Sequence, residues 1–214
     1  MREEFYGELA QLADQLSNLS DMAAVAMRQA THAMLANDIV QAREVIAADI
    51  NVDQAANECE EHAQSLLALQ APVATELRTI LATLYCTSNI ERMGDLAAHV
   101  ASSVKFSHPK PAIPPELRGN FSELGQLTIG MAEHLRDLIT GSAVGGFTEL
   151  QRTDDTVDTL CADVLTTVTS QTWPHGVRMA TNAALLVRFF ERFADQAVDT
   201  ARRLEFAATG ILPR

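Results

Sequence analysis

The residues in this sequence with the clearest chemical potential are acids spaced four positions apart. Residues 90–97 read IERMGDLA and residues 190–197 read FERFADQA, and two further acid pairs stand upstream in DINVD and DDTVD. The four pairs are Asp49 and Asp53, Glu91 and Asp95, Asp154 and Asp158, and Glu191 and Asp195. In a helix, this spacing puts both carboxylates on one face. Carboxylate oxygens bind hard cations, so the repeated pattern indicates metal binding.

Spacing alone does not distinguish a metal site from a solvated helix surface. Glu133 and Asp137 have the same spacing, but Arg28 and His32 stand at the equivalent positions of the first half. The four chosen pairs differ because they recur in both halves of the chain. The acids whose position around the helix was compared with that of apolar residues also lie in line with an apolar stripe. An unpaired carboxylate at such a position is costly and needs a basic partner or a metal.

Other polar residues recur together with the acids. Arg92 and Arg192 directly follow the first acid of a pair, which favours an ion pair with a nearby carboxylate. His99 and Asp199 also occupy equivalent positions, one helical turn further on. They fit either auxiliary metal ligands or a helix surface. Arg78 and Arg178 recur near expected helix starts, which indicates a structural or partner contact.

The elements that must position these residues are helices. Apolar residues recur at three-four spacing, aromatic residues make up only 5%, and prolines cluster at 109–115. We predict helices at 4–35, 39–68, 73–104, 117–140, 147–170 and 177–207. The expected fold is all-α, with two tandem three-helix-bundle repeats. These repeats cover 1–104 and 117–214, joined by a Pro-rich linker at 105–116.

Composition and charge narrow the function classes. The net charge of −12 argues against direct nucleic-acid binding, which requires a positive surface. The sequence contains no apolar run long enough to span a membrane and no signal-peptide core, so we expect a cytoplasmic protein. Its three cysteines form no C-x-x-C motif and are expected to be free thiols.

The chain resembles the PhoU family of phosphate-transport regulators. The resemblance rests on VDQAANECEEHAQSLLALQAPVATELRTIL and IERMGDLAAHVA, and it covers nearly the whole chain. It implies multinuclear metal clusters of divalent or trivalent ions (iron, manganese, magnesium or zinc) at the eight acids of the four pairs. The second repeat departs further, because FERFADQA replaces the usual glycine-bearing ERIGD form. The resemblance groups the acids into two sites, and it favours the first over the second. The first combines Asp49 and Asp53 with Glu91 and Asp95, and the second combines Asp154 and Asp158 with Glu191 and Asp195.

The same resemblance implies a regulator and not an enzyme. Such a protein would couple the ATPase subunit of a phosphate ABC transporter to a phosphate-sensing histidine kinase. It would negatively regulate phosphate uptake and the phosphate-starvation response, form a homodimer, and meet the membrane only through its partners.

Two other hypotheses compete with this one. A ferritin-like dinuclear metal enzyme would carry Glu-x-x-His motifs, but no histidine here has a glutamate three positions before it. A metal-free helical scaffold would instead use its acids in salt bridges to basic groups.

Overall fold

The structure is a computed model that describes residues 2–141 and 146–213, and over those ranges it is helical and has no strand. Its helices are α1 (Arg2–Ala36), α2 (Ile39–Gln70), α3 (Ala74–Ser107), η1 (Pro115–Leu117, a short 3-10 turn), α4 (Arg118–Ile139), α5 (Gly146–Val168) and α6 (Gly176–Thr209). The all-α fold and the order of six long helices are confirmed. The largest difference is at the end of α3, which continues to Ser107 instead of stopping at 104.

Local signals explain most of the helix boundaries. Asp38 is the N-cap of α2, since its carboxylate accepts hydrogen bonds from the backbone N–H groups of Val40 at 2.9 Å and Gln41 at 3.1 Å. The prolines that follow α3 keep the chain non-helical until η1 begins at Pro115. The gap between the predicted helices at 117–140 and 147–170 falls largely outside the described residues.

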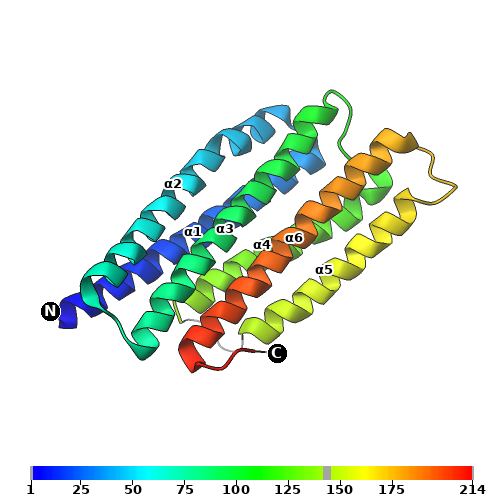
Figure 1. The fold of residues 1–214 in the computed structure, drawn as a ribbon. Helices are drawn as coiled ribbons and strands as arrows, with labels where there is room; N and C mark the ends of the chain where they lie inside the picture. The colour runs from blue at the N-terminus through cyan, green and yellow to red at the C-terminus, as the bar shows by residue number, and fades with distance from the viewer. Residues whose placement is uncertain (1, 142–145, 214) are drawn as a thin grey trace.

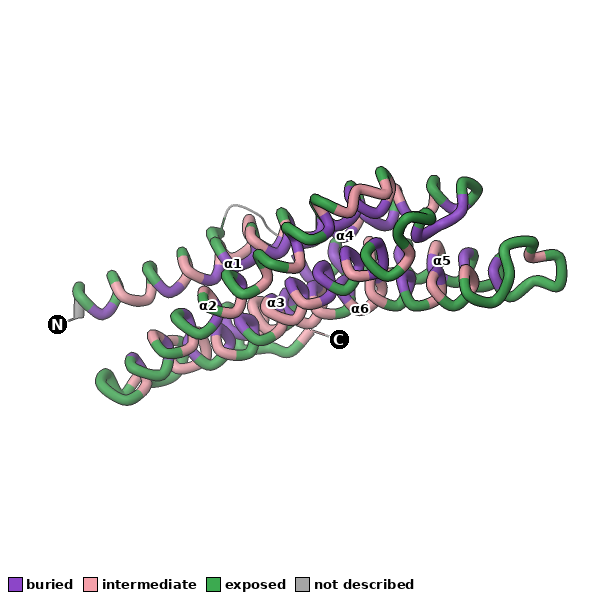
Figure 2. Tube along the Cα trace, turned by 90° about the horizontal axis from the view of Figure 1, so that it is seen from above, coloured by how far each residue is buried: buried purple, intermediate pink, exposed green. Residues whose placement is uncertain are grey.

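The six helices form two layers. Helices α2, α3, α6 and α5 lie side by side, and α1 and α4 pack behind them (Figures 1 and 2). Buried residues from both repeats join in one hydrophobic core, in which the rings of Phe121 on α4 and Phe190 on α6 lie 6.0 Å apart. Cys59, Cys86 and Cys161 are free, as expected, and the structure buries them in this core. None of the helices described has the length and hydrophobicity needed to cross a membrane.

Helices α3 and α6 run antiparallel through the middle of the front layer, and the recurring arginines hold them at both ends. Arg78, near the start of α3, donates to the carbonyl of Ala207 near the end of α6 at 3.4 Å. Arg178, near the start of α6, donates to the carbonyl of Phe106 near the end of α3 at 3.3 Å. Each arginine thus supplies a donor to the carbonyl-rich end of the neighbouring helix. These contacts explain why both positions recur.

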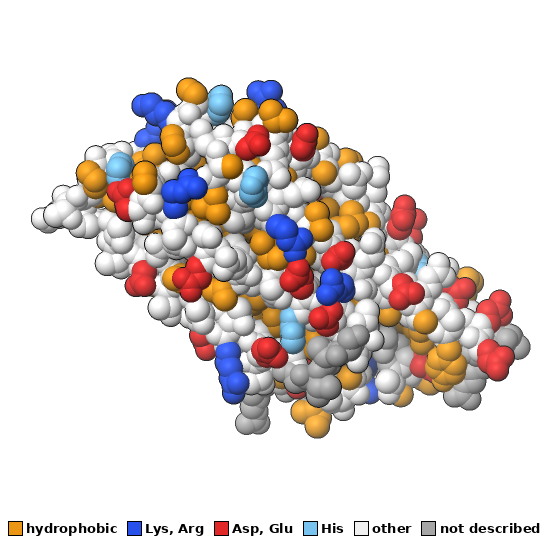
Figure 3. All heavy atoms as spheres, turned by 180° about the vertical axis from the view of Figure 1, so that it is seen from behind, with side chains coloured by type: hydrophobic (Ala, Val, Ile, Leu, Met, Phe, Trp, Pro, Cys, Tyr) orange, Lys and Arg blue, Asp and Glu red, His pale blue; other side chains and the backbone are white. Residues whose placement is uncertain are grey.

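The back face, formed by α1 and α4, mixes acidic with basic side chains (Figure 3). Glu133 pairs there with Arg28, and Asp137 pairs with Arg136. The acid pair that lacks a repeat therefore belongs to surface ion pairs, which contribute little to stability. Its neutral environment makes it a useful control for the four repeated pairs.

A glycine sets the distance between α2 and α3 at the level of the first acids. A methyl group added at Gly94 would lie 2.9 Å from Cγ1 of Val52, whose side chain is buried and β-branched. Val52 stands between Asp49 and Asp53, and Gly94 stands between Glu91 and Asp95. The close approach of the two helices here brings the acids of α2 toward those of α3.

We predict that Gly94→Ala destabilises the protein by about 1–2 kcal/mol. Overpacking against Val52 costs about 1–3 kcal/mol, and the higher helix propensity of alanine recovers up to about 1 kcal/mol of it. Gly130→Ala is the matched control, because Gly130 lies within α4 with no atom within 4 Å of the added methyl group. Urea unfolding should show Gly130→Ala to be as stable as the parent or more so. Equal stability of the Gly94→Ala and Gly130→Ala variants would contradict the close contact.

Candidate functional site: two carboxylate sets

The first carboxylate set consists of Asp49 and Asp53 on α2 with Glu91 and Asp95 on α3. The structure brings these four acids together across the contact between the two helices. Partial burial raises the pKa of Asp49, and the charges of Asp95 and Asp53 raise it further. Partial burial likewise raises the pKa of Glu91, as do the charges of Asp95, Asp53 and Asp49. The set is thus a concentration of mutually repelling negative charge.

Basic groups next to the first set offset part of this repulsion. Arg92 forms an ion pair with Asp95, as the sequence predicted. The charge of His99 favours the ionised form of Asp49 and so counteracts the rise of its pKa. The ring of His99 also packs against Phe189 of α6, with ring centroids 5.2 Å apart. His99 therefore connects the first set to the α3–α6 contact.

The second carboxylate set consists of Asp154 and Asp158 on α5 with Glu191 and Asp195 on α6. Burial and the surrounding acids, Asp158 first among them, raise the pKa of Asp154 from 3.8 to about 6. Oδ1 of Asp154 is buried and has no hydrogen-bond partner among the residues that the structure describes. Such an oxygen is energetically costly in a folded protein. The sequence favoured the first set as the firmer site, yet the unsatisfied oxygen lies in the second.

The second set also has its own basic neighbours. Arg188 forms an ion pair with Glu191. Burial and the charge of Glu191 raise the pKa of Asp195, while the charges of Arg188 and Arg192 act in the opposite direction. Arg188 has no acidic or basic counterpart in the first repeat, where Ser88 occupies its position. The sequence reasoning therefore missed this partner.

Asp199 serves the helix contact and not the second set. It accepts hydrogen bonds from Asn89 at 3.0 Å and from Arg202 at 2.6 Å, and Arg203 lies at 3.1 Å. Burial tends to raise the pKa of Asp199, but these donors and the charge of Arg203 hold it below its ordinary value. Of the two auxiliary candidates, His99 thus faces its set and Asp199 is tied to other residues.

The two sets fit a hard cation by chemistry, but their side chains are not arranged as a finished coordination sphere. Their oxygen donors are those that iron, manganese or magnesium prefer, and the unsatisfied Asp154 oxygen is a suitable ligand. Across residues 2–141 and 146–213, however, no three His, Cys, Asp or Glu side chains are grouped closely enough to hold a metal ion. Asp95 and Glu191 are instead turned toward Arg92 and Arg188.

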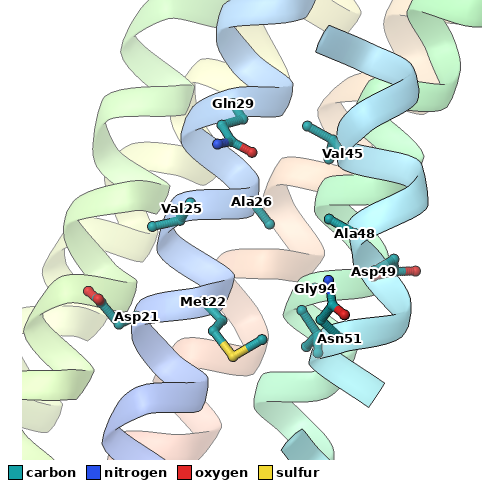
Figure 4. Close-up of a pocket in the computed structure, with 11 residues that line it drawn as sticks. Asp21, Met22, Val25, Ala26, Gln29, Val45, Ala48, Asp49, Asn51 and Gly94 are labelled. Carbon is teal, nitrogen blue, oxygen red and sulfur yellow. The ribbon is translucent and has the colours of Figure 1, made fainter. Parts of the chain in front are cut away.

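A hollow of about 190 Å³ lies between α1 and α2, behind the first set (Figure 4). Met22 and Ala26 of α1 and Val45 and Ala48 of α2 supply apolar walls. Asp49 stands at the edge with its carboxylate pointing away from the hollow. Sequence reasoning missed this feature because its apolar lining residues have the spacing of core residues.

An equivalent hollow of about 230 Å³ lies between α4 and α5 in the second repeat. His134 lines it at the position that Gln29 holds in the first repeat, and its Nε2 is 3.8 Å from Oε2 of Glu149. Both repeats therefore have a small hollow between corresponding helices.

Comparison with known proteins identifies the family. The model of the PhoU domain matches twice, at residues 16–104 and 121–204. The chain is similar over its full length to the Mycobacterium tuberculosis "Phosphate-specific transport system accessory protein PhoU homolog 2", at 37% identity over 213 residues covering 100% of both proteins. It is 36% identical to a Mycobacterium leprae PhoU homolog 1, covering 100% of this chain and 96% of that protein.

Solved structures show the same fold. The crystal structure of the phosphate transport system regulatory protein PhoU from Streptococcus pneumoniae superposes with a TM-score of 0.88 at 22% identity, covering 98% of this chain and 99% of that one. PhoU from Pseudomonas aeruginosa gives a TM-score of 0.83 at 20% identity, covering 97% and 100%. The two domain matches, the full-length relatives and the shared fold agree: this chain belongs to the PhoU family.

Proposed function

We propose that this protein is a non-enzymatic accessory protein of a phosphate transport system. It is expected to act in the cytoplasm as a homodimer. There it would couple the ATPase subunit of the transporter to a phosphate-sensing histidine kinase, so that uptake and the starvation response are repressed when phosphate is plentiful. The observation that carries the proposal is the full-length 37% identity to proteins named as phosphate-specific transport system accessory proteins.

We further propose that the two carboxylate sets bind cations in this protein. The four acids of the first set are half-buried, as are Asp154 and Glu191 of the second. Burial, together with the charges of neighbouring acids, raises the pKa of Asp49 and Glu91 in the first set and of Asp154 and Asp195 in the second. A bound cation would supply the missing positive charge and a partner for the oxygen of Asp154. Small rotations of Asp95 and Glu191 away from their arginines would free further oxygens.

A metal-free scaffold is the second candidate, because the structure gives it specific support. Arg92 pairs with Asp95 and Arg188 pairs with Glu191, so each set already contains one internal ion pair. In this alternative, the remaining acids would meet basic groups of a partner protein.

Deletion of the gene tests the regulatory proposal. In high phosphate, the deletion strain should express its phosphate-starvation genes, because the repressing link between transporter and kinase is gone. Reporter expression is the measurement, and the parent gene supplied in trans should restore repression. Full repression in the deletion strain would count against the proposed regulation.

Metal analysis after dialysis tests the carboxylate sets. Asp53→Asn with Asp95→Asn should remove the metal of the first set alone, and Asp154→Asn with Asp195→Asn should remove that of the second alone. Glu133→Gln with Asp137→Asn is the matched control, because it makes the same charge change at an acid pair already neutralised by Arg28 and Arg136. A parent protein that binds no iron, manganese, magnesium or zinc would establish the metal-free alternative.

The raised pKa of Asp154 predicts how stability depends on pH when chelator keeps metal away. The folded protein holds this proton up to a pKa of about 6, whereas the unfolded chain releases it near 3.8. The folded state therefore binds more protons between these values, and the free energy of unfolding falls as pH rises through that window. This decrease in the free energy of unfolding persists at neutral pH.

Asp154→Asn should therefore unfold at higher urea concentration than the parent above about pH 7. The unfolding midpoints of the variant and the parent should converge below about pH 4. Asp163→Asn provides the control, since it removes one negative charge from an exposed position further along α5. An equal gain in stability from both variants would show that net charge alone, and not the environment of Asp154, is responsible.

A further inference from the structure

Basic side chains gather where α3 and α6 meet at one end of the bundle, although the chain as a whole has a net charge of −12. The acids near this end already have partners within the protein: Glu116 pairs with His175, and Asp38 caps α2. This end is formed by the last turns of α3, the proline-rich segment and the first turns of α6, which meet at the top of Figure 1. The sequence has no Asp or Glu in 96–115 or in 164–190. The chain's two lysines, Lys105 and Lys110, both lie in the first of these ranges. Arg178 adds a third exposed positive charge.

The same end carries an apolar groove between α3 and α6, with a volume of about 440 Å³. Phe106, Leu185 and Phe189 give it mainly apolar walls, and Phe106 and Leu185 are 68% and 51% exposed. A second hollow of about 200 Å³ shares Phe106 and Arg178 with it and extends to Lys110. We call these two connected hollows the α3–α6 groove.

Arg178 is held at the junction of the two hollows. Its guanidinium group lies 5.0 Å from the centroid of the Phe106 ring and donates to the backbone carbonyl of Phe106 at 3.3 Å. The stacking keeps a positive charge beside an exposed aromatic ring. The groove thus offers an apolar surface and a fixed cation in one place.

The two ends of the α3–α6 pair differ in the side chains at the groove positions. At the other end, Tyr85 stands in place of Leu185 and Arg203 in place of Ser103. The guanidinium of Arg203 lies 4.3 Å from the centroid of the Tyr85 ring, so the two side chains fill the equivalent space. The smaller side chains at Leu185 and Ser103 leave it open.

We propose that the α3–α6 groove binds an acidic, amphipathic segment of a partner protein. An apolar side chain of that segment would cover Phe106 and Leu185, whose exposure is costly as a contiguous patch. Its carboxylates would meet Lys110 and Arg178. Because most of this protein's surface repels acids, the basic end orients such a partner and selects for it. The site lies outside the two carboxylate sets, so the proposal stands whether or not they bind metal.

A helical peptide with glutamates on one face and leucine and phenylalanine on the other is the probe. Fluorescence anisotropy should show that it binds the parent protein, and that the binding weakens with added salt. Two control peptides, one with lysine in place of glutamate and one with serine in place of the apolar residues, should not bind. Carbodiimide coupling should join the glutamates of the bound probe to Lys105 or Lys110.

Matched variants locate the binding. Lys110→Glu and Leu185→Ser should each weaken it by ~10-fold or more, because one reverses a charge and the other removes an apolar wall. Arg152→Glu and Leu81→Ser make the same changes at exposed positions outside the groove and should leave binding unchanged. The proposal would be overturned if the probe did not bind, or if the groove variants and the control variants lost equal affinity for it. Binding of phosphatidylglycerol vesicles, but not of the probe, through Lys110 and Leu185 would also overturn it.

Discussion

The antiparallel contact of α3 with α6 is the constraint on which the rest of the molecule depends. Arg78 and Arg178 hold it at both ends by donating to carbonyls near the end of the opposite helix. This contact joins the two repeats in one layer and gives them a common core. It also sets the place of each carboxylate set, because α3 carries half of the first and α6 half of the second. A change in the tilt of this pair would alter both sets and the groove together.

Each carboxylate set is a destabilising feature that the core can support. Packing of α2 on α3 and of α5 on α6 brings the acids together, and their mutual repulsion opposes that packing. The protein limits the cost with one internal ion pair in each set, Arg92 with Asp95 and Arg188 with Glu191. It leaves an unsatisfied oxygen on Asp154. Acidic clusters of this kind are typical of sites that gain stability from a bound cation.

The helices and the pairing of the acids could be predicted from the sequence, because both follow from local patterns. Helix positions follow from apolar spacing and breaks such as Asp38, and the repeat indicated which acids come together. The side-chain partners could not be predicted in the same way. Arg188 has no counterpart in the first repeat, and Asp199 resembles a ligand by position but is bound by Asn89 and Arg202. The groove depends on side-chain size at Leu185 and Ser103, which becomes meaningful only once α3 is known to lie against α6.

We propose that packing of the helices within each repeat creates a cation site. A crystal structure of protein grown with manganese, with anomalous diffraction data, tests this proposal. We expect anomalous peaks between α2 and α3 and between α5 and α6, with oxygen ligands from Asp49, Asp95 and Asp154 among them. Electron density that shows Arg92 on Asp95 and Arg188 on Glu191, with no anomalous peak at either set, would contradict the claim.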